Sequence, residues 1–184
     1  MKKLAEVISR IFSPIIEAPL IIWLVTNLNI TFLGWTKVFL ISLFFLFFLP
    51  YSFFLISLKI GSISDWDVTK RKERYGFNII VLFSVIACLF VFYFLNEKAL
   101  IYFYLRLLFP YFLYFLITFF WKISGHMLVN SIFTLLLYFH FQKPIILFLG
   151  ILLLIITGWS RIKLKKHSLA QVVAGALLPF LVLH

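Results

Sequence analysis

The sequence predicts an all-α fold, a polytopic transmembrane helical bundle of about six to seven spans with a short N-terminal interfacial helix. Hydrophobic residues make up 64% of the 184 residues and aromatic residues 21%, whereas 12% are charged. A soluble domain cannot bury that much apolar surface. Apolar runs of about 20 residues instead fit a hydrocarbon core of roughly 30 Å. We therefore expect one integral-membrane domain over residues 1–184, with its functional core at about 62–178.

Two apolar spans are expected in the first third of the chain. Residues 1–13 predict the interfacial helix, and a proline opens a first span over about 14–34. The turn NLNITFLGWTK leads to a second span over about 36–60. Within this turn, NIT at 29–31 matches a glycosylation acceptor, a pattern that is frequent by chance. The longest polar stretch, SISDWDVTKRKERYGF at 62–77, follows the second span.

Five more spans are expected after this polar stretch. The third begins after it and runs to about residue 95, NEKA turns the chain, and the fourth covers about 99–121. Two shorter segments, over about 126–141 and 144–159, are separated by QKP, where a charge and a proline favour a hairpin turn. The last span covers about 167–183.

Seven crossings would put every second loop on the same side of the membrane. The polar loops at 62–77, 121–126 and 159–167 follow the second, fourth and sixth spans, so we expect all three at one face. The two spans between the last two loops have about 16 residues each, or roughly 24 Å of helix, which is short for a full crossing. We therefore expect a site at this face to lie below the headgroup plane.

The formal net charge of +11 is unevenly distributed across the predicted membrane. It fits inside-positive loops, anionic headgroups or a phosphate-bearing substrate, and no soluble basic face indicates a nucleic-acid partner. Thirteen of the 17 lysines and arginines fall on the face of the three polar loops, and four, at positions 37, 98, 106 and 143, fall on the other. The positive-inside rule then predicts that the polar loops are cytoplasmic, in an inner or plasma membrane.

Two of the polar loops carry histidine motifs. One is ISGH at 123–126, and the other is SRIKLKKHSLAQVVAG at 160–175, which spaces Ser160 and Arg161 ahead of His167. In order and spacing these motifs resemble two of the three signature motifs of the type 2 phosphatidic acid phosphatase superfamily. Members of that superfamily are multi-span lipid phosphatases in which a histidine attacks phosphorus.

The resemblance implies a role for each matching position. His167 matches the nucleophile that attacks phosphate, and His126 matches the general acid that protonates the leaving oxygen. The positions that match phosphate ligands are Arg74, Ser124, Gly125 and Arg161. The better-known members have sites that open to the periplasm or lumen, in contrast to the cytoplasmic face that the charge count predicts.

The first motif of that superfamily is matched only in part. Its arginine corresponds to Arg74, but Tyr75 replaces the proline and Asp67 stands at the lysine position. Lys70 or Arg71 could supply the missing charge, because positions 67, 70, 71 and 74 would share one face at helical spacing.

Gln171 takes the place of the aspartate that orients the nucleophile in most members. A similar histidine-to-glutamine spacing occurs in dolichyl diphosphatases, which favours a polyprenyl diphosphate substrate. Phosphatidate, phosphatidylglycerophosphate and lipid A phosphate stay open as substrates. His167 and Gln171 would lie one helical turn apart, so the amide carbonyl can accept from one ring nitrogen and leave the other to attack. Glutamine lacks the charge of aspartate and would stabilise the resulting imidazolium less.

These residue types suit phosphoryl transfer on physical grounds. Charge spreads over the equatorial phosphate oxygens, so guanidinium groups and backbone donors do most of the catalytic work. One neutral imidazole can attack while a second, protonated imidazole donates to the leaving group. Gly175 would permit tight helix packing. Neither a metal cluster nor a Gly-rich nucleotide loop is visible, so we expect metal-independent chemistry without a cofactor.

Plainer interpretations account for several of the charged residues. Lys163, Lys165 and Lys166 are typical topology anchors. Glu17 and Arg106 lie within apolar spans but close enough to the span ends to snorkel.

Three alternatives concern the functional assignment itself. A lone membrane histidine, such as His140 or His184, is more often a packing or interfacial group. Asp65 and Asp67 would suit the magnesium site of a prenyltransferase, although two acids in one loop are more often caps or partners of lysines. The altered first motif and Gln171 also fit a non-catalytic relative that binds phospholipid or acts as a flippase or scaffold.

Reporter fusions test the predicted orientation. A reporter that is active only in the cytoplasm should be active when it is fused within 62–77 and inactive when it is fused within 96–98. A reporter that requires export should give the opposite pattern. A motif loop found outside the cytoplasm would contradict the orientation.

Overall fold

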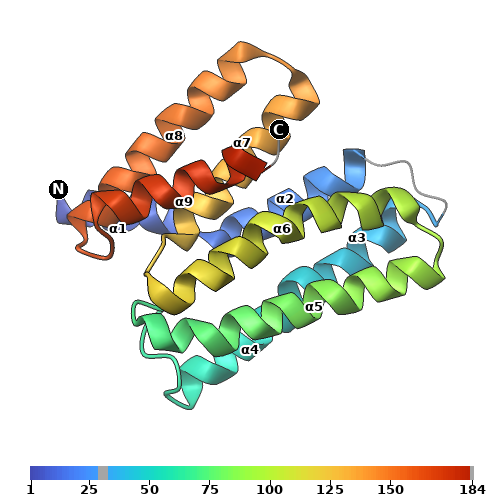
Figure 1. The fold of residues 1–184 in the computed structure, drawn as a ribbon, viewed down its shortest axis with the longest axis horizontal. Helices are drawn as coiled ribbons and strands as arrows, with labels where there is room; N and C mark the ends of the chain where they lie inside the picture. The colour runs from blue at the N-terminus through green and yellow to red at the C-terminus, as the bar shows by residue number, and fades with distance from the viewer. Residues whose placement is uncertain (29–32, 183–184) are drawn as a thin grey trace. The chain divides into compact units, whose positions relative to one another are not determined.

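The structure is a computed structural model that describes residues 1–28 and 33–182 and shows helices and turns in them, without a strand. The prediction of an all-α fold is therefore confirmed for these residues. The helices are α1 (Lys2–Ile11), α2 (Pro14–Leu28), α3 (Trp35–Leu43), α4 (Leu49–Lys59), α5 (Arg74–Phe94), α6 (Lys98–Phe120), α7 (Gly125–Phe141), α8 (Pro144–Lys163) and α9 (Leu169–Val182) (Figure 1). A π-helical turn, η1 (Phe44–Phe48), connects α3 to α4, and a 3-10 turn, η2 (Arg71–Glu73), precedes α5. The glycosylation pattern at 29–31 and His184 lie outside the described residues.

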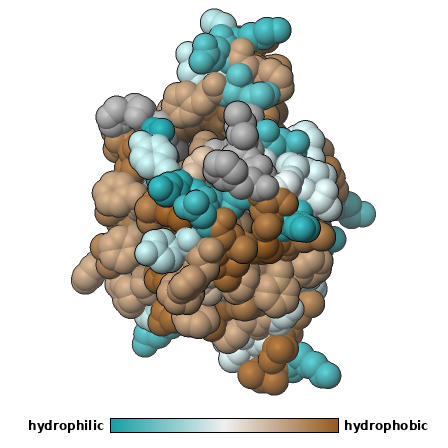
Figure 2. Space-filling model, turned by 90° about the vertical axis from the view of Figure 1, so that its right-hand side faces the viewer, coloured by the Kyte–Doolittle hydropathy of each residue, from teal (hydrophilic) through white to brown (hydrophobic). Residues whose placement is uncertain are grey.

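Five helical stretches among the described residues are long and apolar enough to cross a membrane, which suggests a multi-pass membrane protein. They are Lys2–Asn27, Trp35–Lys59, Arg71–Phe94, Lys98–Phe120 and Pro144–Lys163. The helices α7 and α9 are apolar but shorter. Apolar side chains cover most of the face visible in Figure 2. Large apolar side chains are exposed on most helices, for example Phe83 and Phe90 on α5. Surface of this kind is suited to lipid rather than to water.

The chain forms two compact units, with one boundary within α2 and the other between Trp121 and Lys122. Unit 1 comprises Met1–Ile21 and Lys122–His184, and unit 2 comprises Ile22–Trp121. Both histidine motifs belong to unit 1, whereas the altered first motif belongs to unit 2. The expectation of one domain over the whole chain stays a prediction.

In unit 1, small residues let three helices pack closely. A methyl group added at Gly158 of α8 would lie 2.7 Å from Cγ1 of Val172 in α9. At Gly175 of α9 it would lie 2.6 Å from the backbone oxygen of Ser124, at the start of α7. The hydroxyl of Ser131 in α7 donates to the carbonyl of Ala176 in α9, at 2.8 Å. Close approach of this kind is typical of helices that associate within membranes.

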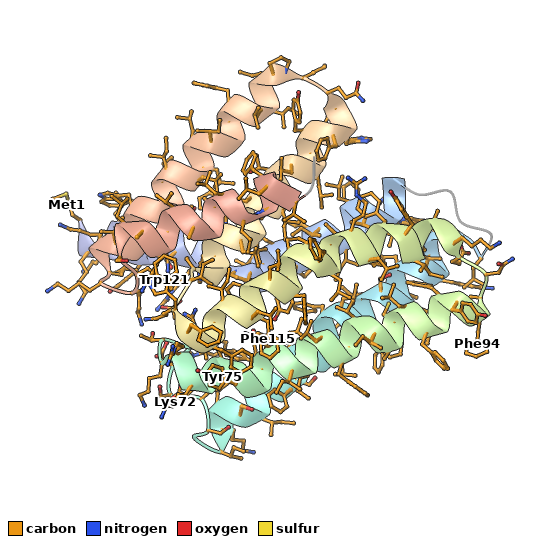
Figure 3. The ribbon with its side chains drawn as sticks, in the orientation of Figure 1. Met1, Lys72, Tyr75, Phe94, Phe115 and Trp121 are labelled. Carbon is orange, nitrogen blue, oxygen red and sulfur yellow. The ribbon has the colours of Figure 1, made fainter. Side chains whose placement is uncertain are left out.

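In unit 2, aromatic and polar contacts join α5 and α6 as a hairpin. The rings of Tyr75 and Phe119 lie 4.9 Å apart, and the hydroxyl of Tyr111 donates to Oδ1 of Asn78 at 2.9 Å. Figure 3 labels Tyr75 and Phe94 near the two ends of α5. At the turn of this hairpin, the buried Oε1 of Glu97 accepts from the backbone of Leu33 at 2.7 Å.

Most helix boundaries match the predicted spans, with three corrections. The helix α5 already begins at Arg74, within the polar stretch at 62–77. The helix α9 begins at Leu169, so His167 lies in the turn before it and does not share a helix face with Gln171.

The third correction concerns α8. The sixth span was expected to end at about residue 159, but α8 has 20 residues and continues to Lys163. The residues after 159 include good helix formers, which favour continuation of the helix. The side chain of Arg161 is buried within unit 1, so the chain does not have to form a loop to expose it to water. Arg161 therefore belongs to the last turn of α8 rather than to a loop.

Replacing Gly175 by alanine should destabilise unit 1. The added methyl group meets backbone rather than a flexible side chain, and overpacking of this kind costs about 1–3 kcal/mol. Gly76→Ala is the matched control, because a methyl group there meets only Cζ of Phe53 at 3.9 Å. The control should leave stability unchanged or raise it by up to about 1 kcal/mol. Thermal unfolding in detergent measures both, and equal midpoints for the two variants would contradict the packing.

Candidate functional site

Three hydrogen bonds join the two histidine-bearing segments of unit 1. The ammonium of Lys122 donates to the carbonyl of Lys166 at 2.8 Å. The backbone N–H of Ser124 donates to the carbonyl of Gln171 at 3.2 Å. The carbonyl of Lys122 also lies 3.2 Å from Nδ1 of His167. Segments more than 40 residues apart in the chain are thus held side by side, in front of the first turns of α7 and α9.

A tight turn at the end of α8 sets the distance from Arg161 to His167. Lys165 adopts a left-handed backbone conformation with φ 55°. The N–H groups of Lys166 and His167 both donate to the carbonyl of Arg161, at 3.0 and 3.3 Å. This satisfies a carbonyl that the helix end would otherwise leave open. The turn therefore fixes His167 at the same end of α8 as Arg161.

The hydrogen bonds of His167 determine which ring nitrogen carries its hydrogen. Nδ1 lies 3.2 Å from the carbonyl of Lys122 and 3.2 Å from Oε1 of Gln171. A backbone carbonyl can only accept, so Nδ1 must donate. In the neutral ring, Nε2 then carries the lone pair and can act as a nucleophile. The N–H of Ser168 also donates to Oε1 of Gln171, at 3.1 Å, which orients the amide.

The ISGH segment leads directly into α7. Ser124 is the N-cap residue of α7 and is fully buried, and its Oγ has no hydrogen-bond partner within residues 1–28 and 33–182. Gly125 and His126 form the first turn, and the side chain of His126 is buried. The first N–H groups of a helix lack intrahelical partners and carry partial positive charge. A hydroxyl, backbone donors and an imidazole at this point form an environment suited to an anion.

Arg161 is among the most buried side chains of unit 1. It is 1% exposed, and its Nη1 donates to Oγ of Ser9 in α1 at 2.5 Å. Burial of a guanidinium is costly unless hydrogen bonds or negative charge compensate it. The structure thus places Arg161 in the same unit as both histidines, on the helix that precedes His167.

A buried polar group links α2 to α7, and the sequence analysis missed it. Nδ2 of Asn130 lies 2.9 Å from Oε2 of Glu17, 2.7 Å from the carbonyl of His126 and 3.2 Å from the carbonyl of Phe12. Glu17 is only 3% exposed, so the interpretation that it snorkels to a span end is wrong. The available signal was an asparagine four residues after His126, within an otherwise apolar run.

The first-motif residues lie in unit 2, where Arg74 is the buried one. Arg74 begins α5, and its Nε donates to the carbonyl of Val68 at 2.8 Å. Val68 has a left-handed backbone conformation with φ 46°. Arg71 lies in η2 and is half-buried, whereas the Lys70 side chain is 70% exposed and pairs with Glu73 at 3.2 Å.

The helical face expected for positions 67, 70, 71 and 74 is not formed. Lys70 is extended, and a single 3-10 turn separates it from α5. The cause is Asp65, whose carboxylate accepts from the N–H groups of Asp67 and Thr69 at 2.9 and 3.2 Å and thereby stabilises a loop.

A metal centre finds no support in the part of the chain that the structure describes. No group of three or more His, Cys, Asp or Glu residues that could hold a metal ion occurs there. Asp65, one of the two acids considered for magnesium, binds loop N–H groups instead.

No protein-family model, curated protein or solved structure matches this chain. The assignment of a function therefore rests on its own residues. Unit 1 supplies an imidazole of defined tautomer, a second buried imidazole, a buried guanidinium and two helix N-termini.

Replacing Asn130 by alanine should destabilise the protein by about 1–3 kcal/mol, because it leaves the buried carboxyl group of Glu17 without the amide that donates to its Oε2. Asn27→Ala is the matched control. Its amide donates an exposed hydrogen bond to the carbonyl of Trp23, so its loss should change stability by less than about 0.5 kcal/mol. The midpoints of thermal unfolding in detergent measure the stability of both variants. An equal effect of the two substitutions would contradict a structural role for the Asn130 contacts.

Proposed function

We propose that the protein is an integral-membrane lipid phosphatase or diphosphatase that acts through a phosphohistidine intermediate. The observation that carries the proposal is the contact of His167 Nδ1 with the carbonyl of Lys122 and Oε1 of Gln171. It orients the ring and leaves the lone pair on Nε2. Imidazoles held in this way serve as nucleophiles in group transfer.

The reaction has two steps. Nε2 of His167 forms a bond to phosphorus as the bond to the leaving oxygen breaks, and a protonated His126 gives its proton to that oxygen. Neutral His126 then takes a proton from water as the water oxygen attacks phosphorus. The N–P bond breaks, inorganic phosphate leaves and His167 is restored.

Arg161 and the first turns of α7 and α9 supply positive charge to the phosphate oxygens. A guanidinium offers fixed, paired donors, and backbone N–H groups at a helix start add to them. Ser124 and Gly125 provide a hydroxyl and close backbone approach. By the motif resemblance, Arg74, with Lys70 or Arg71, is proposed as a further phosphate ligand. The chemistry requires no metal ion or other cofactor.

The substrate is a lipid phosphate whose tail lies among the aromatic helices. Polyprenyl diphosphate, phosphatidate, phosphatidylglycerophosphate and lipid A phosphate all present the required tetrahedral anion. Gln171 favours the polyprenyl diphosphate, by analogy with the dolichyl diphosphatases.

The protein is proposed to cross an inner or plasma membrane about seven times, with α1 at the interface and the histidine loops on the cytoplasmic face. The helices α7 and α9, with 17 and 14 residues, are shorter than a full span. Their N-termini would therefore begin below the headgroup plane, where a phosphate could meet them.

A panel of lipid phosphates tests the proposal, with detergent-solubilised protein, EDTA in the buffer and phosphate release as the readout. His167→Ala should reduce the rate by at least about 10³-fold, as expected for loss of a nucleophile. His140→Ala, at the exposed C-terminal end of α7, is the matched control and should retain the wild-type rate.

The other outcomes point to different functions. Activity that survives His167→Ala rejects the nucleophile. Activity that is lost in EDTA favours a magnesium-dependent prenyltransferase. Absence of activity on every lipid phosphate favours a phospholipid-binding protein, flippase or scaffold, to which the altered first motif and Gln171 would also be suited.

A further inference from the structure

The N-terminal helix α1 has two different sides. Ala5 and Ser9, four residues apart, are buried, and α1 packs against α8. Leu4, Val7 and Ile11 are exposed. Residues three and four apart share a helix face, so α1 turns a small-residue face to the protein, and on its exposed side apolar residues lie beside the charged Lys3, Glu6 and Arg10.

Ser9 is the residue of the inner face that touches the candidate site. Its Oγ accepts from Nη1 of Arg161 at 2.5 Å, a contact across 152 residues of sequence. Both side chains are at least nine-tenths buried, which protects the hydrogen bond from competition by water. A bond from a charged donor is also stronger than one between neutral groups.

We propose that Ser9 is a positioning residue of the phosphate site, which holds the guanidinium of Arg161 in place for the headgroup. This inference rests on the proposed function. Arginine has a long, flexible side chain, and each rotatable bond that is fixed before binding lowers the entropy cost of binding. A hydroxyl can fix it without cancelling its charge, whereas a carboxylate at the same position would compete with phosphate.

The inference gives α1 a role besides that of a surface anchor. Ala5 is fully buried one turn before Ser9, so its small side chain lets α1 approach the protein closely. A helix at the start of the chain thereby completes a site built from α7, α8 and α9. The motif resemblance does not extend to this part of the sequence.

Two measurements on full-length protein in detergent test the inference. The first is the dissociation constant for inorganic phosphate, and the second is modification of Arg161 by phenylglyoxal, located by peptide mass mapping. Ser9→Ala should weaken phosphate binding about three- to ten-fold and increase modification of Arg161. Ser9→Thr keeps the hydroxyl and should restore both values to within about two-fold of the wild type.

Ser131→Ala is the matched control. Ser131 is also a buried serine of unit 1 that donates one hydrogen bond to a carbonyl, but that carbonyl belongs to Ala176. It should leave phosphate binding and Arg161 modification unchanged, although it removes a helix-packing contact. Equal effects of Ser9→Ala and Ser131→Ala would reduce Ser9 to a packing residue and overturn the inference.

Failure of the inference and failure of the proposed function look different. If Ser9→Ala leaves both readouts at the wild-type value, Ser9 does not position Arg161. A different outcome is that wild-type protein neither binds phosphate nor hydrolyses any lipid phosphate, yet Ser9→Ala increases the modification of Arg161 by phenylglyoxal. The proposed function is then wrong, but Ser9 still positions the side chain of Arg161.

Discussion

The candidate site depends on one constraint, the pairing of the segment before α7 with the segment before α9. Lys122 is engaged twice, through its ammonium with the carbonyl of Lys166 and through its own carbonyl with Nδ1 of His167. Neither segment can shift along the other without breaking both contacts. The orientation of the His167 ring is therefore a consequence of backbone geometry, and Gln171 reinforces it.

This pairing depends in turn on how closely α9 approaches α7. Gly175 lies against the carbonyl of Ser124, where a larger residue would push the helices apart. Four residues earlier, the carbonyl of Gln171 accepts from the N–H of Ser124. Close packing and hydrogen bonding thus act at the same place, and separation by a few tenths of an ångström would affect both. The packing of α9 against α7 and the positions of the residues before α9 therefore depend on each other.

The helices could be predicted from the sequence, because the length and apolar character of a span are local properties. The approach of Gln171 to His167 was also predicted, but the reason given, a shared helix face, is wrong, because His167 precedes α9 and Gln171 reaches back to it from the first turn of that helix. The contacts of Arg161 with Ser9 and of Asn130 with Glu17 could not be predicted, since each joins residues more than 100 positions apart. Lys70 was misplaced for another reason, because the carboxylate of Asp65 stabilises a loop where charge spacing alone suggested a helix.

Within unit 1, Arg161 and His167 each have a neutral hydrogen-bond partner in a buried setting, a hydroxyl for the first and an amide for the second. Such partners orient a group without adding negative charge, which in a low dielectric would repel an incoming phosphate. In the proposed reaction, the amide would stabilise an imidazolium less than a carboxylate would, so it would slow attack on phosphorus but make the approach of the anion more favourable. Weaker stabilisation of the imidazolium in return for less repulsion of the anion would favour a headgroup with more negative charge. For the proposed enzyme, Gln171 is therefore better matched to a diphosphate than to a monophosphate.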